Sequence, residues 1–200
     1  MLLNAIKPSM AELGYKKIGP YHDFVKTFSD GINGFISLGY SNCLTPHTTY
    51  VDINIGYGED RSNNLLQDLL GRKRIHNSYA CCNINYCDLF PESKYSDYVW
   101  KIDDETSVKK VASIIITNVN NHIDPFLSEV CTAKTYIDRV LEGKHLTTSR
   151  KDHLIPIVYY LLGEKKKGLA YIEKQLSEGG THYSDIDDLA FIENYKKLPQ

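Results

Sequence analysis

The 200-residue chain has little of several features that would narrow its function at once. It has no marked excess of either charge, because 23 lysines and arginines stand against 25 aspartates and glutamates. Nucleic-acid-binding domains normally carry a basic excess or a basic stripe, so this balance argues against a nucleic-acid partner. No run approaches the roughly 18 apolar residues of a membrane span, which argues against a membrane partner.

Signals for export are also missing. The stretch Met1–Pro8 lacks the charged lead and the uninterrupted apolar run of a secretory signal peptide. The five cysteines are an odd number, which fits reduced and mostly buried thiols better than a disulfide framework. We therefore expect a cytoplasmic protein. The cysteines are Cys43, Cys81, Cys82, Cys87 and Cys131.

Catalytic and cofactor motifs are equally scarce. Adjacent Cys81 and Cys82 lack the C-x2-C spacing of structural zinc sites, and neither G-x-S-x-G nor H-E-x-x-H occurs. The segment Gly163–Gly168 has the glycine spacing of a P-loop, but Leu169-Ala170 follows instead of Lys-Ser/Thr. We therefore expect no catalytic residue, no cofactor and no bound metal.

The sequence does contain many tyrosines and a clear strand pattern. Fifteen tyrosines against six phenylalanines is a heavy load of a residue that favours sheet rims and interfaces. In Thr49–Tyr57, apolar and polar residues alternate, which indicates an antiparallel strand with one solvated face. The strands expected from such patterns are Tyr21–Phe28, Gly34–Ser41, Thr49–Tyr57, Asn77–Tyr86 and Tyr95–Ile102.

Apolar residues at helical spacing occur before, between and after these strands in the sequence. An N-terminal helix is expected to begin near Asn4 or to kink at Pro8, and to stop at Gly14. A short helix is expected over Ser62–Leu70, with Ser62 as its N-cap. Helices are then expected from Thr106 to an end or restart at Pro125, and over Ala133–Glu142, Lys151–Leu162, Glu164–Leu176 and Ser184–Tyr195.

Because the expected strands come first in the chain and most of the helices come later, the sequence predicts an α+β fold, in which an N-terminal antiparallel meander packs against a C-terminal group of helices. We expect a single domain over residues 1–200. Residues 1–105 would be mainly strands with an N-terminal helix, and residues 106–200 would be helical. One joint core is expected, because the apolar face of the sheet is the natural surface for the helices.

Three segments resemble the bacterial domain-of-unknown-function family 4304. Ile6–Pro8 and Leu13–Lys17 together are similar to its opening segment, with Tyr15 in place of the usual Phe. Val51–Gly56 is similar to one of its strands, and Ile157–Leu176 is similar to its closing hairpin. The family has no established activity, but some members look like neighbours of polymorphic-toxin systems. The resemblance therefore implies an immunity protein, a small protein that occludes a toxin.

A non-enzymatic protein-binding domain is the function that these observations favour. Its expected contact residues are tyrosines at the sheet rim and acidic residues at two helix starts. Carboxylates at helix starts also complement the helix dipole, which explains the acidic groups without any partner. The expected partner-binding residues are Asp103, Asp104, Glu105, Tyr57, Tyr86, Asp185, Asp187 and Asp188.

The alternative is a hydrolase or nuclease whose site is assembled from dispersed His, Asp and Cys residues. Glu164-Lys165-Lys166 has the E-x-K order of metal-dependent nucleases, with Asp52 as the upstream carboxylate. That segment is expected to begin a helix, and Asp52 to lie on the polar side of a strand. A deep pocket holding two or more such groups would favour this alternative. An adaptor built on the helix pair Lys151–Leu176 would need more than one such unit.

Overall fold

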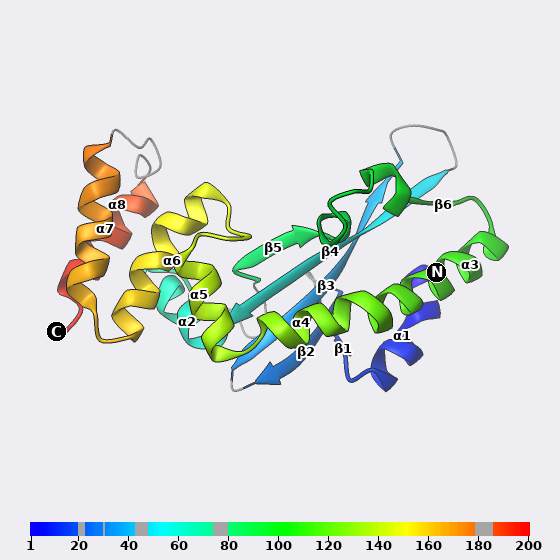
Figure 1. The fold of residues 1–200 in the computed structure, drawn as a ribbon, viewed down its shortest axis with the longest axis horizontal. Coiled ribbons are helices and arrows are strands. Elements are labelled where there is room, and N and C mark those ends of the chain that lie inside the picture. Colours follow the sequence, from blue (N-terminus) through cyan, green and yellow to red (C-terminus); the bar gives the residue numbers. More distant parts are fainter. Residues whose placement is uncertain (20–22, 30, 43–47, 74–79, 179–185) are drawn as a thin grey trace.

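The computed structural model describes residues 1–19, 23–29, 31–42, 48–73, 80–178 and 186–200 (Figure 1). Its strands are β1 (Lys16–Lys17), β2 (Phe24–Ser29), β3 (Ile32–Ser41), β4 (Thr49–Glu59), β5 (Cys82–Asn85) and β6 (Trp100–Ile102). Its α-helices are α1 (Leu2–Glu12), α2 (Asp60–Leu69), α3 (Glu105–Asn118), α4 (Asp124–Val130), α5 (Ala133–Leu141), α6 (Thr148–Leu161), α7 (Lys165–Ser177) and α8 (Ile186–Lys197). An N-terminal antiparallel sheet and mostly C-terminal helices confirm the predicted α+β class.

The sheet is a meander in which β1 to β5 are antiparallel neighbours in chain order. The long strand β4 pairs with β3 along one edge. Its other edge is shared by two short strands, with β5 opposite Asn54–Tyr57 and β6 opposite Thr49–Val51. Asp52 and Ile53 therefore lie in the interval between β5 and β6.

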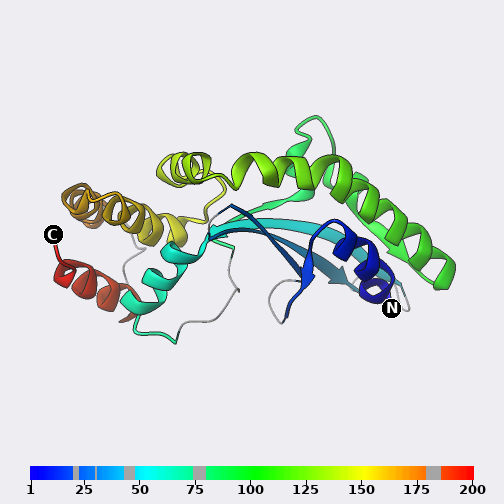
Figure 2. The same cartoon turned by 90° about the horizontal axis from the view of Figure 1, so that it is seen from below.

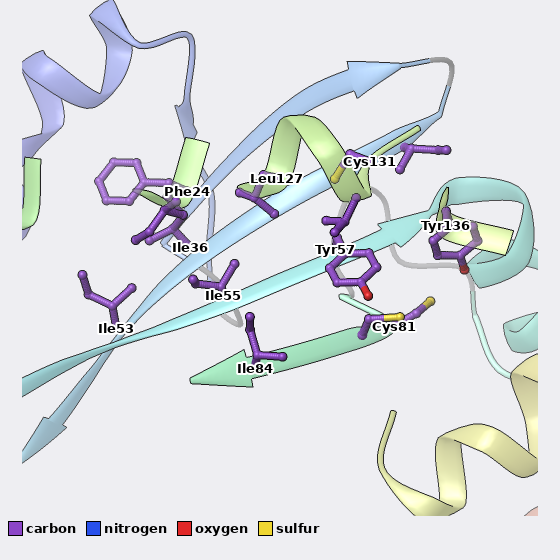
Figure 3. Close-up of a cluster of buried hydrophobic side chains, with 14 of the residues drawn as sticks. Phe24, Ile36, Ile53, Ile55, Tyr57, Cys81, Ile84, Leu127, Cys131 and Tyr136 are labelled. Carbon is purple, nitrogen blue, oxygen red and sulfur yellow. The ribbon is translucent and has the colours of Figure 1, made fainter. Parts of the chain in front are cut away.

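One face of the sheet is covered by helices. A π-helical turn, η3 (Val119–Ile123), joins α3 to α4, and together they cross this face, while α1 packs against α3 (Figures 1 and 2). Figure 3 shows Leu127 and Cys131 beside Ile55 and Tyr57, all of them buried. Because full burial of a large apolar side chain contributes about 1.5–3 kcal/mol, this layer is a major source of stability.

The other face of the sheet carries the alternate residues of the same strands. At its centre none of these residues is buried, in contrast to the covered face. A small apolar cluster of Val25, Phe35 and Ala80, with Ile18 against it, covers part of this side. We call the uncovered part the open face; it is formed by Ser37, Gly39, Ser41, Tyr50, Asp52 and Asn54.

The helices α5 to α8 form a group beyond one end of the sheet rather than on its face (Figure 1). They gather around α2, which follows β4 directly and contacts both α6 and α8. The expectation that the helical half covers the sheet is thus correct only for α3 and α4. One large hydrophobic cluster nevertheless runs from Leu2 in α1 to Tyr195 in α8. No helix in the described ranges is long and apolar enough to cross a bilayer.

Several predicted element ends need correction. The first helix begins at Leu2 rather than near Asn4 and continues through Pro8, while its stop at Gly14, whose φ is +86°, is confirmed. The helix α2 begins at Asp60, so Ser62 lies inside its first turn, where its hydroxyl donates to Glu59 (2.6 Å). The last predicted strand is reduced to β6, because residues 95–98 form a 3-10 turn, η2 (Tyr95–Tyr98).

Candidate functional site

A pocket of about 300 Å³ opens on the open face of the sheet. The strands β3 and β4 form its floor, and the segment between β5 and β6 forms one wall. We call it the tyrosine pocket. Its lining residues are Gly39, Tyr40, Ser41, Tyr50, Asp52, Asn54, Tyr95 and Val99.

Asp52 lies in the floor of the tyrosine pocket because the neighbouring strand lacks a side chain there. Gly39 is the register partner of Asp52. A Cβ atom built on Gly39 would overlap Asp52 Oδ1 and would lie 2.8 Å from Asp52 Cγ. The carboxylate therefore lies directly over the glycine backbone, and a larger residue at position 39 would displace it.

Neutral groups form the hydrogen bonds of the Asp52 carboxylate. The Tyr95 hydroxyl donates to Oδ2, and Asn54 Nδ2 approaches Oδ1 at 3.4 Å. The hydrogen bond to Asp52, followed by burial, raises the pKa of Tyr95 to about 12. The Tyr95 hydroxyl therefore stays protonated at neutral pH and acts as a donor, while Asp52 remains only partly buried.

The segment that carries Tyr95 is anchored by a cluster of aromatic rings. Phe90 and Tyr98 stack with centroids 5.2 Å apart, and Tyr86 meets them edge-on at 5.3 Å and 5.1 Å. His122, from the π-helical turn η3, packs edge-on against Phe90 at 5.2 Å. Since such pairs contribute about 0.5–1.5 kcal/mol each beyond their buried area, the cluster fixes the segment while Tyr95 stays exposed.

The chain segment that forms one wall of the tyrosine pocket is rich in acidic residues. Between Asn85 and Glu105, six acidic residues stand against two lysines, and one of these, Lys101, pairs with Asp103 (Nζ–Oδ2 2.9 Å). Burial, followed by nearby carboxylates that include Asp52, raises the pKa of the Cys87 thiol at the edge of this region. We call the acidic residues of this segment the acidic edge; they are Asp88, Glu92, Asp97, Asp103, Asp104 and Glu105.

The predicted acidic group at the start of α3 is exposed and also serves the helix. Asp104 is the N-cap of α3 and accepts a hydrogen bond from the backbone N–H of Ser107 (2.7 Å). Glu105 pairs with Lys109 one turn later (3.1 Å). Capping thus explains the position of Asp104, as the helix-dipole interpretation predicted. Asp103, Asp104 and Glu105 all remain at the surface beside β6.

The two predicted tyrosines lie in the core, which corrects their assignment to the sheet rim. Tyr57 is 0% exposed, and its hydroxyl contacts His145 Nδ1 at 2.9 Å. Tyr86 is 2% exposed within the aromatic cluster. A partner cannot reach either side chain in this conformation. Tyr40, Tyr50 and Tyr95 are the tyrosines that line the surface pocket instead.

The second predicted acidic group does not form one surface with the first. Asp187 pairs with Arg72, and Asp188 is buried and pairs with His153 Nε2 (2.9 Å). Asp185 lies outside the described residues. The helix α8 lies at the opposite end of the molecule from β6 and the start of α3 (Figure 1). The contacts of Asp187 and Asp188 hold the helical group together.

The structure also shows where the cysteines and the nuclease-like segment lie. Cys81, Cys82 and Cys131 are buried, as predicted, Cys87 is partly exposed, and none of these four described cysteines is in a disulfide; Cys43 lies outside the described residues. Within the described ranges, no group of three or more His, Cys, Asp or Glu residues is placed to hold a metal ion. The Glu164-Lys165-Lys166 segment begins α7, as predicted.

One sequence pattern indicates some of the residues of the tyrosine pocket that were not predicted as site residues. Alternation in Thr49–Tyr57 places Tyr50, Asp52 and Asn54 on the polar face of the strand. Tyr95 had no such signal, because it belongs to a 3-10 turn that had been predicted as strand.

Comparison with known proteins does not assign the chain to a family. No protein-family model matches the chain, and no curated protein or solved structure matches it either. The resemblance to the bacterial domain-of-unknown-function family 4304 stays a prediction. The α+β fold with a tyrosine pocket on an uncovered sheet face is therefore the basis for a functional proposal.

Proposed function

We propose that the protein is a non-enzymatic binding domain that receives a partner protein on the open face of its sheet. The tyrosine pocket is the observation that carries this proposal. Tyrosine is enriched at protein interfaces because it offers a large, rigid contact area with a polar tip, and a few such residues dominate binding. An immunity protein that occludes a toxin, as the family resemblance implies, is one case of this function.

The use of charged groups elsewhere supports a binding role. Away from the open face and the acidic edge, carboxylates pair with cations, as Asp124 does with Lys26 and Asp187 with Arg72. The pair of His153 and Asp188 combines groups suited to acid–base chemistry, but it joins α6 to α8 with Asp188 buried and His153 only 13% exposed. By contrast, the tyrosine pocket and the acidic edge present unlike chemistries, aromatic and anionic, side by side at the surface.

A charge-neutral variant tests this proposal by affinity capture from the source cells. Replacing Asp103→Asn, Asp104→Asn and Glu105→Gln removes three charges from the acidic edge with little change in shape. Asn at position 104 keeps the N-cap of α3. We expect the wild-type chain to capture a partner, and this variant to bind that partner about tenfold more weakly, since rim charges mainly set the rate of association.

The matched control removes the same charge elsewhere, by Glu12→Gln, Glu173→Gln and Glu193→Gln, at three exposed positions. The control should capture the partner as well as the wild type does. A second variant, Tyr50→Ser with Tyr95→Ser, should lose capture. A partner retained equally by all of these variants, or a wild-type chain recovered alone at every salt concentration, would contradict the proposal.

A further inference from the structure

We propose that the tyrosine pocket binds the cationic side chain of one lysine or arginine from the partner protein. Asp52 would be its counter-ion, and the rings of Tyr50 and Tyr95 would form its walls. This inference rests on the proposed function, because it assumes that the cation belongs to a protein.

Asp52 differs from its neighbours in the kind of partner that it has. Asp103 pairs with Lys101 (2.9 Å), and Glu105 pairs with Lys109 (3.1 Å). The side-chain contacts of Asp52 within the described chain come from a hydroxyl and an amide, both neutral. Because a partly buried carboxylate is stabilised most by an opposite charge, Asp52 is suited to an external cation.

The molecule contains a filled version of the same arrangement. Lys26 Nζ lies 2.7 Å from Asp124 Oδ1, 5.3 Å from the ring centroid of Tyr15 and 4.9 Å from that of Phe28. The Tyr15 hydroxyl also donates to Asp124 Oδ1 (2.9 Å). One carboxylate, a tyrosine hydroxyl bonded to it and aromatic rings thus hold an ammonium group.

The tyrosine pocket repeats this arrangement with no lysine among its lining residues, because Lys101, which lies opposite Tyr50, pairs with Asp103. The Tyr95 hydroxyl donates to Asp52, as that of Tyr15 does to Asp124, and Tyr50 supplies a second ring. A volume of about 300 Å³ is at the small end of ligand pockets, which suits one side chain better than a folded element. The acidic edge around it would attract a basic partner and disfavour an acidic one.

The test uses the full chain and two small probes, N-acetyl-arginine methylamide and its citrulline counterpart, which has nearly the same shape but no charge. Binding is measured by NMR titration of the ¹⁵N-labelled protein. We expect the arginine probe to shift resonances centred on Gly39, Asp52, Asn54 and Tyr95. The citrulline probe should bind about tenfold more weakly, because it lacks both the ion pair and the cation–π contact.

Two variants distinguish binding of the probe in the pocket from general attraction of the probe to the acidic surface. Asp52→Asn keeps the shape of the side chain and removes the ion pair, so it should reduce the difference between the two probes to the part that the cation–π contact supplies. Glu92→Gln removes one charge from an exposed position on the acidic edge and should leave that difference unchanged. The dispersion of the amide resonances reports in the same spectra that both variants are folded.

Several results would overturn the inference. These are equal binding of the two probes, a selectivity for arginine that Asp52→Asn does not reduce, or shifts scattered along the acidic edge. A captured partner whose binding ignores Asp52→Asn would overturn this inference and leave the proposed function intact. Arginine binding in the pocket without any captured partner would support a cation site at Asp52 but contradict the proposed function.

Discussion

Gly39 in β3 and Gly168 in α7 both lie where a methyl group would collide with a polar side chain, but in regions of opposite character. On the open face, a Cβ on Gly39 would overlap the partly exposed carboxylate of Asp52. In the helical group, a Cβ on Gly168 would overlap the buried hydroxyl of Tyr195, which donates to the Pro156 carbonyl (2.7 Å).

The difference lies in whether the crowded side chain can move. Asp52 can turn toward solvent, whereas Tyr195 is 0% exposed and held by its hydrogen bond. The glycine in the helical group therefore serves stability, and the glycine on the open face serves the position of a single carboxylate. Each can be tested by its own substitution.

The largest effect on stability is expected from Gly168→Ala. The new methyl group would overlap the Tyr195 hydroxyl, lie 2.9 Å from Tyr195 Cζ and lie 3.0 Å from the Pro156 carbonyl oxygen. Overpacking of this kind costs about 1–3 kcal/mol, which outweighs the gain of up to about 1 kcal/mol from alanine in a helix. Urea unfolding should show a lower midpoint. An unchanged or higher midpoint would show that the helices can separate without cost.

A smaller loss, about 1–2 kcal/mol, is expected from Tyr195→Phe, because it leaves the buried Pro156 carbonyl without this donor. The same unfolding measurement checks it. The double variant with Gly168→Ala should lose less than the sum of the two, since the phenylalanine ring lacks the oxygen that the methyl group meets. Additive losses would mean that the overlap at Gly168 is not what destabilises α7.

A histidine between the sheet and the helical group leads to a prediction about how the stability of the fold depends on pH. His145 lies between α5 and α6 with a φ of +59°, and its Nδ1 contacts the Tyr57 hydroxyl. Burial, followed by the charge of Arg139, lowers the pKa of His145 below its ordinary value of 6.5. The unfolded chain then binds this proton at higher pH than the folded chain, so stability falls as the pH drops through 6.5 toward the lowered pKa.

Melting temperatures measured between about pH 5 and pH 8 test this dependence. The variant His145→Asn removes the titrating group, and asparagine tolerates the left-handed backbone better than most residues do. The wild-type protein should lose more stability toward pH 5 than the variant does. Parallel profiles would assign the pH dependence to other histidines, of which the chain has six.

Much of the fold followed from the sequence because alternation reports directly which face of a strand is apolar. Val51, Ile53 and Ile55 lie on the covered face as predicted, and β2 to β4 form the predicted meander, to which β1 adds a short strand that was not predicted. The location of α5 to α8 could not be predicted in this way. An apolar stripe shows that a helix must pack, but not whether it packs on the sheet or around α2.

The site was harder to predict, because it combines residues that are distant in the chain. Tyr95 reaches Asp52 across 43 positions, and no periodic pattern connects them. Tyr57 was assigned to the surface by residue type, although alternation had already placed it with Val51 on the apolar face. Where the two signals conflict within one strand, periodicity was the better guide.

The smallest effect on stability is expected from Gly39→Ala. The methyl group would push the Asp52 carboxylate out of the pocket floor. Because Asp52 can turn toward solvent, the free energy of unfolding should change by no more than about 0.5 kcal/mol. Binding of the arginine probe should nevertheless fall about as far as it does in Asp52→Asn, since the counter-ion is no longer in place.

The control for this prediction is Ser37→Ala, which lies on the same face of β3 but does not line the tyrosine pocket. It should keep wild-type binding in the same titration. If Gly39→Ala binds the arginine probe normally, the position of Asp52 does not determine recognition. If instead it destabilises the fold as strongly as Gly168→Ala does, the carboxylate is as rigidly held as the Tyr195 hydroxyl, and the two glycines serve the same purpose.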